Sequence, residues 1–246
     1  MKQYEAVIET LKKLGGIATL GQLNQEVFKI VDCEWKTKTP FASIRRIVQQ
    51  TPNEIYKIKP GLYGLVSCKN QLEKNGYIVE TELNKDSKEV QEFSHSYYQG
   101  ILLTVGNLKH MDTFSPNQDK NRKFINQTLG EIRSLSVIPK FSYEKFVQRS
   151  STIDAIWFNK RMMPDSFFEV EHSTDISNSL EKYNDLQDFN VRMIIVADKK
   201  RREEFNVKYQ RSSFDNIRNR VSFLDYESLN RQYEREVEAQ TFEIIL

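Results

Sequence analysis

The sequence predicts an α+β protein of two domains, a small helical domain with a β-hairpin followed by a larger domain with a central mixed sheet flanked by helices. Three observations favour this class. Apolar residues recur at helical spacing through the first 50 residues, two short alternating segments follow at 55–66, and strand-like and helix-like segments alternate beyond residue 93. A chain of 246 residues is long enough for two separate cores.

The composition is typical of a folded protein without a membrane span. With 39% hydrophobic and 28% charged residues and only 9 Gly and 6 Pro, disordered and collagen-like classes are excluded. The apolar run Met193–Ala197 is far shorter than the ~20 residues that span a bilayer, and residues 1–5 contain no apolar signal core. We therefore expect a cytoplasmic protein without membrane attachment. Cys33 and Cys68 form no Cys-x-x-Cys pair, so two unpaired thiols are expected.

The near-neutral total charge conceals two basic segments. Residues 1–66 carry ten Lys and Arg against six Asp and Glu, and residues 199–220 carry eight against three. Local positive surfaces favour polyanion binding, because neutralised phosphates release counterions. The alternative is an ordinary solvated helix face. The sequence contains no glycine-rich phosphate loop, so no nucleotide cofactor is expected.

The first 66 residues predict three helices and a hairpin, each with local signals for its ends. In order, these are a helix over 4–14 ended by Gly15 and Gly16, a helix over 20–30 capped by Thr19, a helix over 40–50 that begins at Pro40, and strands over 55–59 and 62–66 around a turn at Pro60 and Gly61. This order is the plan of a winged helix-turn-helix.

Two segments of this region resemble the winged helices fused to bacterial restriction enzymes and the related HARE-HTH modules. They are Thr-Lys-Thr-Pro-Phe-Ala-Ser-Ile-Arg-Arg-Ile (37–47) and Ile-Lys-Pro-Gly-Leu-Tyr-Gly-Leu (58–65). The resemblance implies a third helix in the DNA major groove. The DNA contacts it implies are Ser43, Arg45, Arg46 and Gln49 on that helix and Lys57 and Lys59 on the wing. A winged helix that contacts another protein is the alternative.

The domain boundary is expected within a polar segment of weak patterning. We assign residues 1–66 to the DNA-recognition domain, 67–92 to a linker with one possible strand at Tyr77–Leu83, and 93–246 to the second domain.

Three carboxylates lie on two predicted strands of the second domain. The apolar strand 152–158 carries a single acid, Asp154, and the strand 166–172 carries Glu169 and Glu171 on one face. Carboxylates among apolar residues are costly to ionise unless a cation compensates them. A Mg²⁺ ion, which takes oxygen ligands, would do so. Predicted elements follow in the order helix 176–186 capped by Thr174 or Asp175, strand 191–197, helix 201–210, strand 221–226 and a charged terminal helix.

The second domain contains a motif that resembles that of the PD-(D/E)XK nuclease superfamily, the fold of many type II restriction endonucleases. It consists of Asp154, fourteen further residues and then Glu169-Val170-Glu171. The likeness extends to a first helix at 95–107, a strand from Asp112, and the segments 129–132 and 138–141. The pattern usually ends in lysine, whereas Glu171 occupies that position, as in a Glu-x-Glu variant found in some restriction enzymes.

The resemblance implies that Asp154 and Glu169 hold Mg²⁺, for which Mn²⁺ would substitute. Glu171 would orient the attacking water or bind a second ion, and Lys182 would supply a displaced positive charge unless it is an ordinary exposed lysine. Auxiliary candidates are Gln99, Glu131 and His172. Their alternatives are a helix amide for Gln99, a solvated helix acid for Glu131 and a local hydrogen-bonding residue for His172.

We therefore expect a Mg²⁺-dependent, site-specific endonuclease of double-stranded DNA that leaves 5′-phosphate and 3′-hydroxyl ends and acts as a homodimer. Base modification is a further hypothesis for what it recognises. Additional backbone contacts are expected from Lys199, Lys200, Arg201 and Arg202. Two alternatives stay open: a non-enzymatic DNA-binding regulator with a degenerate nuclease fold, and a repair or RNA nuclease.

Overall fold

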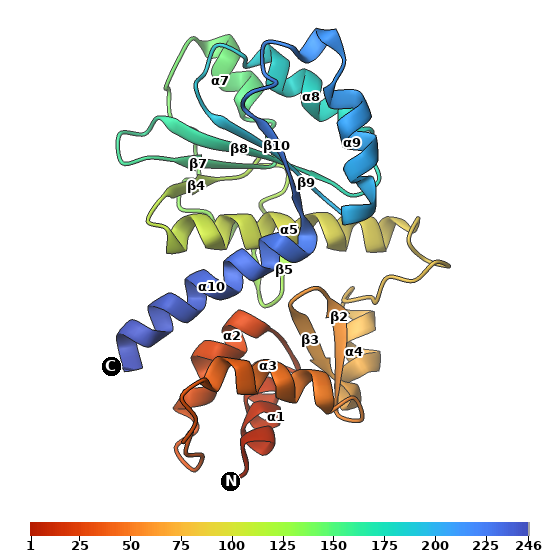
Figure 1. Cartoon of the computed structure of the whole chain (residues 1–246), viewed down its shortest axis with the longest axis vertical. Coiled ribbons are helices and arrows are strands. Elements are labelled where there is room, and N and C mark those ends of the chain that lie inside the picture. The colour runs from red at the N-terminus through yellow and green to blue at the C-terminus, as the bar shows by residue number, and fades with distance from the viewer. Residues whose placement is uncertain (246) are drawn as a thin grey trace. The chain divides into compact units, whose positions relative to one another are not determined.

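The computed structural model describes residues 1–245, with side chains through Phe242, and divides into two compact units (Figure 1). One unit comprises Met1–Phe93 together with the chain from Asn230 onward, and the other comprises Ser94–Leu229. Helices α5 (Lys88–Leu108) and α10 (Tyr226–Ile245) each contribute residues to both units. In the part of the chain that the structure describes, no helix combines the length and the apolar character needed to cross a membrane.

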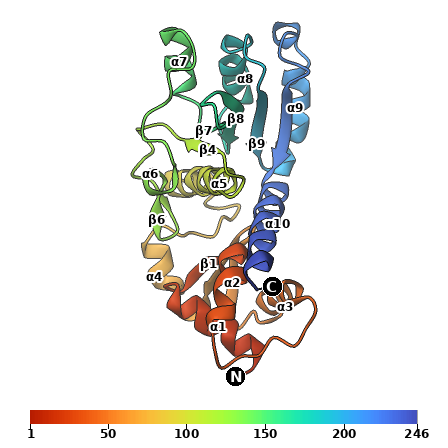
Figure 2. The ribbon, with the colours of Figure 1, turned by 90° about the vertical axis from the view of Figure 1, so that its left-hand side faces the viewer.

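The first unit begins with helices at the N-terminal end of the chain (Figure 2) and contains an antiparallel sheet of order β1-β3-β2. Its elements before α5 are α1 (Gln3–Lys13), β1 (Ile17–Thr19), α2 (Leu20–Glu26), η1 (Val27–Lys29), α3 (Pro40–Gln50), β2 (Ile55–Lys59), β3 (Leu62–Leu65), η2 (Val66–Cys68) and α4 (Lys69–Lys74). The three predicted helices and the predicted hairpin are confirmed. Strand β1 was not predicted, and it pairs Ile17 with Gly64 of β3.

Local signals explain where these helices begin and which faces they bury. Thr19 caps α2 by accepting a hydrogen bond from Gln22 N at 3.0 Å, and Gln22 Oε1 accepts one from Thr19 N at 2.9 Å. The apolar faces of α1, α2 and α3 form one core. The end of α10 joins this unit, because the Phe242 ring packs edge-on 4.7 Å from Phe41.

The segment predicted as a linker is partly helical, since it contains α4 and the start of α5. The strand predicted at Tyr77–Leu83 is wrong: the structure has no strand there. The apolar pattern has another cause, because Tyr77 is buried and packs 5.6 Å from the ring of Phe93. Asn84 then holds a turn by accepting a hydrogen bond from Thr81 N at 2.7 Å.

The second unit contains a five-stranded mixed sheet of order β10-β9-β8-β7-β4, which confirms the predicted mixed sheet. Strand β9 runs parallel to β8 and β10, and the other pairs are antiparallel. Its elements after α5 are β4 (Asp112–Phe114), β5 (Lys123–Phe124), β6 (Gln127–Thr128), α6 (Leu129–Ile132), α7 (Glu144–Ser150), β7 (Ala155–Phe158), β8 (Pro164–Glu171), α8 (Ile176–Asp185), β9 (Arg192–Ala197), η3 (Lys199–Arg201), α9 (Arg202–Tyr209), η4 (Ser212–Phe214) and β10 (Val221–Asp225).

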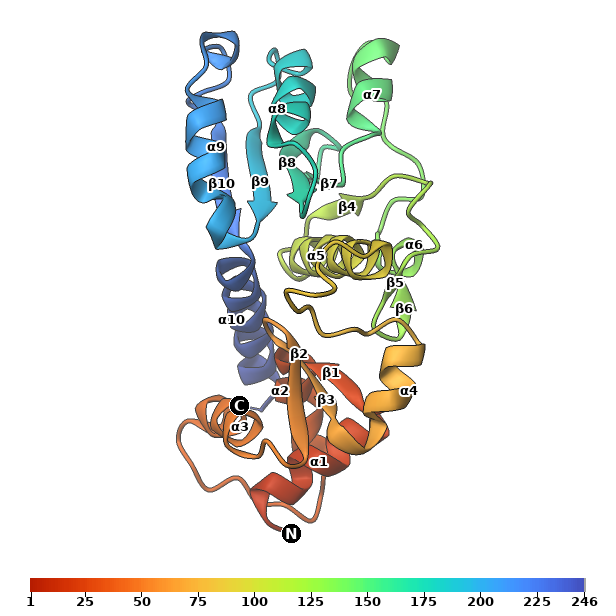
Figure 3. The same cartoon turned by 90° about the vertical axis from the view of Figure 1, so that its right-hand side faces the viewer.

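Helices cover both faces of this sheet, with α7 and α8 on one side and α5 across the other (Figures 1 and 3). Ile156 and Phe158 belong to the core formed with α8. Trp157 instead faces α5 and donates a hydrogen bond from Nε1 to Leu102 O at 3.0 Å. Gly106 permits this close approach, because a Cβ there would lie 2.6 Å from Trp157 Nε1. The contact fixes α5 against β7 and so determines which α5 side chains reach the strand's first residues.

Candidate active site

The three predicted carboxylates lie where β7 begins and β8 ends. Asp154 immediately precedes β7, and its Oδ2 accepts a hydrogen bond from Val170 N of β8 at 2.7 Å. Glu169 and Glu171 share one face of β8, and both carboxylates lie within hydrogen-bond distance of Ser179 Oγ of α8, which is 3.0 Å from Glu169 Oε2. The antiparallel pairing of β7 and β8 therefore brings together acids that are 15 or more residues apart in sequence.

Glu169 and Glu171 are buried and Asp154 is mostly buried, with 13% of its side chain exposed. Burial raises the pKa of Glu169, the Asp154 charge raises it further, and Lys182 opposes both effects. Burial would also raise the pKa of Asp154, but His95 and the Val170 N–H together hold it below its usual value. Glu169 Oε1 is buried and has no hydrogen-bond partner among the described residues. A bound cation would satisfy this oxygen.

Lys182 joins the carboxylates from α8. Its Nζ lies 2.7 Å from Glu169 Oε2 and 3.2 Å from Thr152 O, and 24% of its side chain is exposed. The exposed-lysine alternative is therefore wrong. Helix register explains the position: Asp175 caps α8, so that Ser179 and Lys182, three residues apart, face the same strand.

Glu171 is surrounded by hydroxyl groups, with no cation on its carboxylate oxygens among the described contacts. Thr174 and Ser179 both donate hydrogen bonds to its carboxylate. Burial raises the pKa of Glu171, and these two hydroxyls oppose the shift. Through Ser179 the Glu171 and Glu169 side chains restrain each other.

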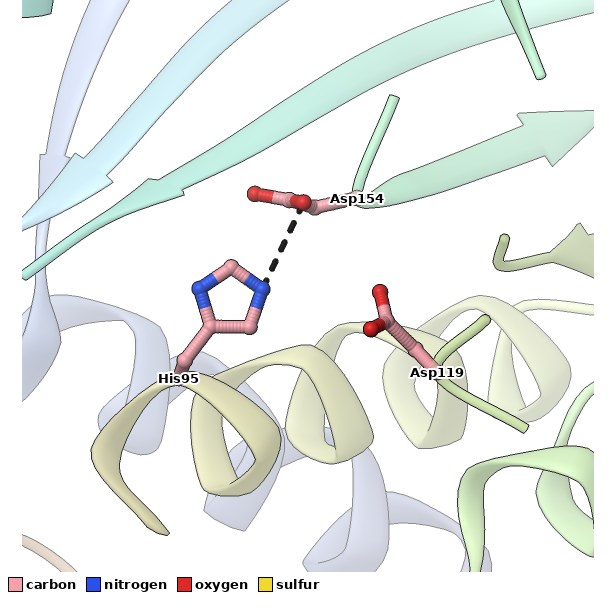
Figure 4. A group of neighbouring side chains, drawn as sticks. All are labelled: His95, Asp119 and Asp154. Atoms are coloured by element: carbon pink, nitrogen blue, oxygen red, sulfur yellow. Dashed lines mark ion pairs between the residues drawn. The ribbon is translucent and has the colours of Figure 1, made fainter. Parts of the chain in front are cut away.

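Two residues outside the predicted set, His95 and Asp119, approach Asp154 (Figure 4). His95 Nε2 of α5 lies 3.4 Å from Asp154 Oδ1, and Asp119, in the loop after β4, offers a carboxylate oxygen to the same group, whose ligand atoms lie within 4.8 Å of one another. Gln99 connects Asp119 with Asp154, because its Nε2 donates to Asp119 Oδ2 at 3.2 Å and to Asp154 O at 2.6 Å.

Gln99 thus lies beside Asp154, and its auxiliary role stays a prediction. The four-residue spacing of His95 and Gln99 on a predicted helix could have identified the histidine. No local signal in the sequence marks Asp119.

The other two auxiliary residues have local roles. Glu131 Oε2 accepts a hydrogen bond from Thr128 N at 2.7 Å and so completes the cap of α6, where it is exposed to solvent. His172 Nδ1 lies 3.5 Å from Tyr226 Oη, and the two rings stack with centroids 6.4 Å apart.

The predicted DNA contacts on α3 differ in how available they are. Arg45 Nη2 forms ion pairs of 3.1 Å with Glu234 and with Glu238 of α10, so its charge is compensated within the first unit. Arg46 is exposed and hydrogen-bonds Gln50 Oε1 at 2.9 Å. Ser43 is half-buried and donates to Thr39 O at 3.3 Å, while Gln49 of α3 and Lys57 of β2 are exposed.

Lys59 is not available for the predicted wing contact, which is a correction. Its side chain is 4% exposed, and its Nζ lies 3.4 Å from Glu80 Oε2 and 5.2 Å from the centroid of the Phe93 ring. Burial lowers the pKa of Lys59, and Glu80 opposes that shift. The physical reason is a register irregularity between Lys57 and Lys59, which breaks the strand's simple alternation and turns Lys59 inward.

In the second basic segment, residues 199–202 also differ in whether their side chains are exposed or paired within the protein. Lys199 and Lys200 are exposed in η3. Arg201 is turned inward, which corrects its expected role as a backbone contact: it donates to Glu171 O at 3.1 Å and to Thr174 O at 2.6 Å, and so fixes the turn after β8. Arg202 is about half exposed and lies 3.5 Å from Asp225 Oδ2.

Fold and site together define an α+β protein in which the ends of strands β7 and β8 and two helices enclose a group of carboxylates with one lysine. A sequence model of the family described as type II restriction enzyme NmeDI C-terminal domain matches residues 77–245, more than half of the chain, and the chain belongs to this family. No curated protein and no solved structure matches it.

Proposed function

We propose that this chain is a Mg²⁺-dependent endonuclease of the PD-(D/E)XK type that cuts double-stranded DNA at specific sites and leaves 5′-phosphate and 3′-hydroxyl ends. One observation carries the proposal: Asp154, Glu169 and Lys182 meet in one buried group, in a chain whose family is a restriction-enzyme domain. The lysine missing from the third motif position is supplied from α8.

Asp154 and Glu169 fit a divalent metal ion. Glu169 is buried and Asp154 mostly so, Glu169 Oε1 lacks a partner among the described residues, and oxygen donors are the ligands that Mg²⁺ prefers. Mn²⁺ accepts the same donors and would substitute. When bound, such an ion acidifies a coordinated water and stabilises negative charge on the phosphate.

The chain's own residues would position the reacting groups. The Val170 N–H and His95 orient the Asp154 carboxylate, and Ser179 orients Glu169. The Lys182 ammonium would donate a hydrogen bond to a phosphate oxygen as negative charge grows there. Glu171, held by Thr174 and Ser179, would accept a hydrogen bond from the attacking water.

The first unit would recognise DNA as a winged helix. Its helices α1 to α3 and the β2–β3 hairpin follow one another in that plan, and α3 exposes Arg46 and Gln49. With Lys57 exposed on the hairpin, these side chains would contact phosphates and base edges. Exposed Lys199 and Lys200 would add backbone contacts from the second unit.

Arg46 and Arg45 should respond differently to replacement by alanine. Arg46→Ala is expected to weaken DNA binding at least about fivefold and to flatten its salt dependence, because an exposed cation is lost. Arg45→Ala should instead lower the free energy of unfolding by roughly 1 kcal/mol, since Glu234 and Glu238 lose their partner.

Fluorescence anisotropy at several salt concentrations and chemical denaturation would measure these two effects. Exposed Lys12→Ala on α1 is the matched control. Unchanged affinity and salt slope for Arg46→Ala would exclude α3 as the DNA-binding helix.

The proposed activity is tested by incubating the protein with unmodified and methylated plasmid, with Mg²⁺ or with EDTA. Discrete fragments in Mg²⁺ alone would establish site-specific cleavage, and a difference between the plasmids would show that base modification matters. Fragments cut in both strands, together with a dimeric mass in solution, would support a homodimer with two sites across the duplex. DNA binding without cleavage of any substrate would contradict the proposal and favour a regulator.

A further inference from the structure

A nitrogen ligand and an additional carboxylate stand beside Asp154, outside the Asp154–Glu169 pair. His95 comes from the second turn of α5, Asp119 from the loop after β4, and Asp154 from the start of β7, and Figure 4 shows the three side chains pointing toward a common space. The two oxygens of Asp154 have different partners. Oδ1 faces His95, whereas Oδ2 accepts a hydrogen bond from the Val170 N–H of β8.

The separations are close to those of ligands around one ion. With metal–ligand bonds of about 2.0–2.2 Å, ligand atoms lie about 3 Å apart when adjacent and about 4.3 Å apart when opposite. His95 Nε2 and Asp154 Oδ1 are 3.4 Å apart, and the ligand atoms of the group lie within 4.8 Å of one another. Shifts of a few tenths of an ångström would bring the three ligand atoms within bonding distance of one ion.

The surrounding hydrogen bonds leave ligand capacity unused. Arg122 Nε lies 2.9 Å from Asp119 Oδ1, and Gln99 Nε2 donates to Asp119 Oδ2, yet each carboxylate oxygen has two lone pairs. Arg122 is 40% exposed, so solvent already shares its charge. Gln99 Oε1, on a fully buried side chain, and Glu169 Oε1 have no hydrogen-bond partner among the described residues. Around Asp154, buried acceptor oxygens therefore outnumber the hydrogen-bond donors that the described residues supply to them.

The donor set determines the kind of ion. Mg²⁺ favours all-oxygen coordination and retains its waters, whereas an imidazole nitrogen favours first-row transition metals. One imidazole with two carboxylates suits Mn²⁺ and its neighbours in the series.

We propose that His95, Asp119 and Asp154 form a second cation site, which takes a divalent transition-metal ion through one imidazole nitrogen and two carboxylates and shares Asp154 with the Asp154–Glu169 pair. The inference rests on metal binding at Asp154, as the proposed function does, but not on DNA cleavage. Two neighbouring ions that share a carboxylate would make this a dinuclear centre.

The test is a Mn²⁺ titration of the full chain, in which electron paramagnetic resonance counts the free ion and pulsed measurements detect coupling to imidazole nitrogen. Wild type should bind two ions per chain and show nitrogen coupling. His95→Gln and Asp119→Asn should each lose one ion, and His95→Gln should also lose the coupling. Glu169→Gln should lose one ion and keep the coupling, whereas Asp154→Asn should weaken both sites.

His110→Asn is the matched control, since His110 is an exposed histidine of the same unit and asparagine tolerates its positive φ of 58°. Circular dichroism would verify that each variant is folded. Nitrogen coupling absent from wild type, or retained in His95→Gln, would overturn the proposal. Failure to cleave DNA with the expected Mn²⁺ results intact would contradict the proposed function and leave the second site standing.

Discussion

Replacing Asp154 by asparagine is expected to reduce DNA cleavage by about 10⁴-fold, the size of loss seen when one member of a catalytic group is removed. Asparagine keeps an oxygen that can accept the Val170 N–H, so the junction of β7 and β8 should survive. It loses the negative charge that would bind the metal ion and that pairs with His95. Chemistry should therefore be lost while the fold and DNA binding are retained.

Single-turnover cleavage of plasmid in saturating Mg²⁺ would measure this loss, with anisotropy to follow DNA binding. Asp188→Asn is the matched control, because Asp188 is an exposed aspartate in the turn after α8. Cleavage by Asp154→Asn at the wild-type rate would remove Asp154 from the mechanism. A cleavage loss accompanied by unfolding would require the less perturbing Glu169→Gln variant for the same comparison.

Elements with strong local signals could be predicted from the sequence. Pro40 begins α3, and Asp175 caps α8, as their positions ahead of apolar helical patterns indicated. The alternation of Glu169 and Glu171 with apolar residues was enough to place both acids on one strand face, because side-chain direction in a strand has a period of two. Local periodicity thus predicted the relative positions of Glu169 and Glu171, two of the three predicted acids.

Features that depend on strand irregularity or on distant partners could not be predicted. The irregularity between Lys57 and Lys59 turns Lys59 into the core, although simple alternation offered it to solvent. Arg45 was predicted to contact DNA because the resemblance to winged helices implies that its helix lies in the major groove. Its partners Glu234 and Glu238 come from the far end of the chain, about 190 residues away, where no local pattern connects them.

The neighbourhood of Asp154 illustrates the same limit. His95 and Gln99 reach it because α5 packs against β7 at Gly106 and Trp157, a contact between segments about 50 residues apart. Asp119 lies in a loop whose sequence has no periodicity, and only the fold brings it to Asp154. A candidate ligand in a loop is therefore recognised only from the structure, whereas a ligand on a strand or helix can be recognised in the sequence by its periodic spacing.

Lys182→Met should lower the rate of DNA cleavage by about 10²–10³-fold, the loss typical of removing one preorganised donor from a developing negative charge. The same variant should not require more Mg²⁺ for its half-maximal rate. The reason is that Lys182 Nζ, 2.7 Å from Glu169 Oε2, competes with a metal ion for this carboxylate. Removing the lysine therefore removes a competitor for the metal as well as a donor to the phosphate.

This separation of rate from metal requirement distinguishes two roles for Lys182. If it served only to neutralise Glu169 in the folded chain, Mg²⁺ would replace it and the saturated rate would be unchanged. If it donates to the phosphate, the rate stays low at every Mg²⁺ concentration, and Lys182→Arg recovers part of it because the positive charge is retained. Lys160→Met, at an exposed lysine in the turn between β7 and β8, controls for general loss of charge. A wild-type rate for Lys182→Met at saturating Mg²⁺ would return the third catalytic role to Glu171.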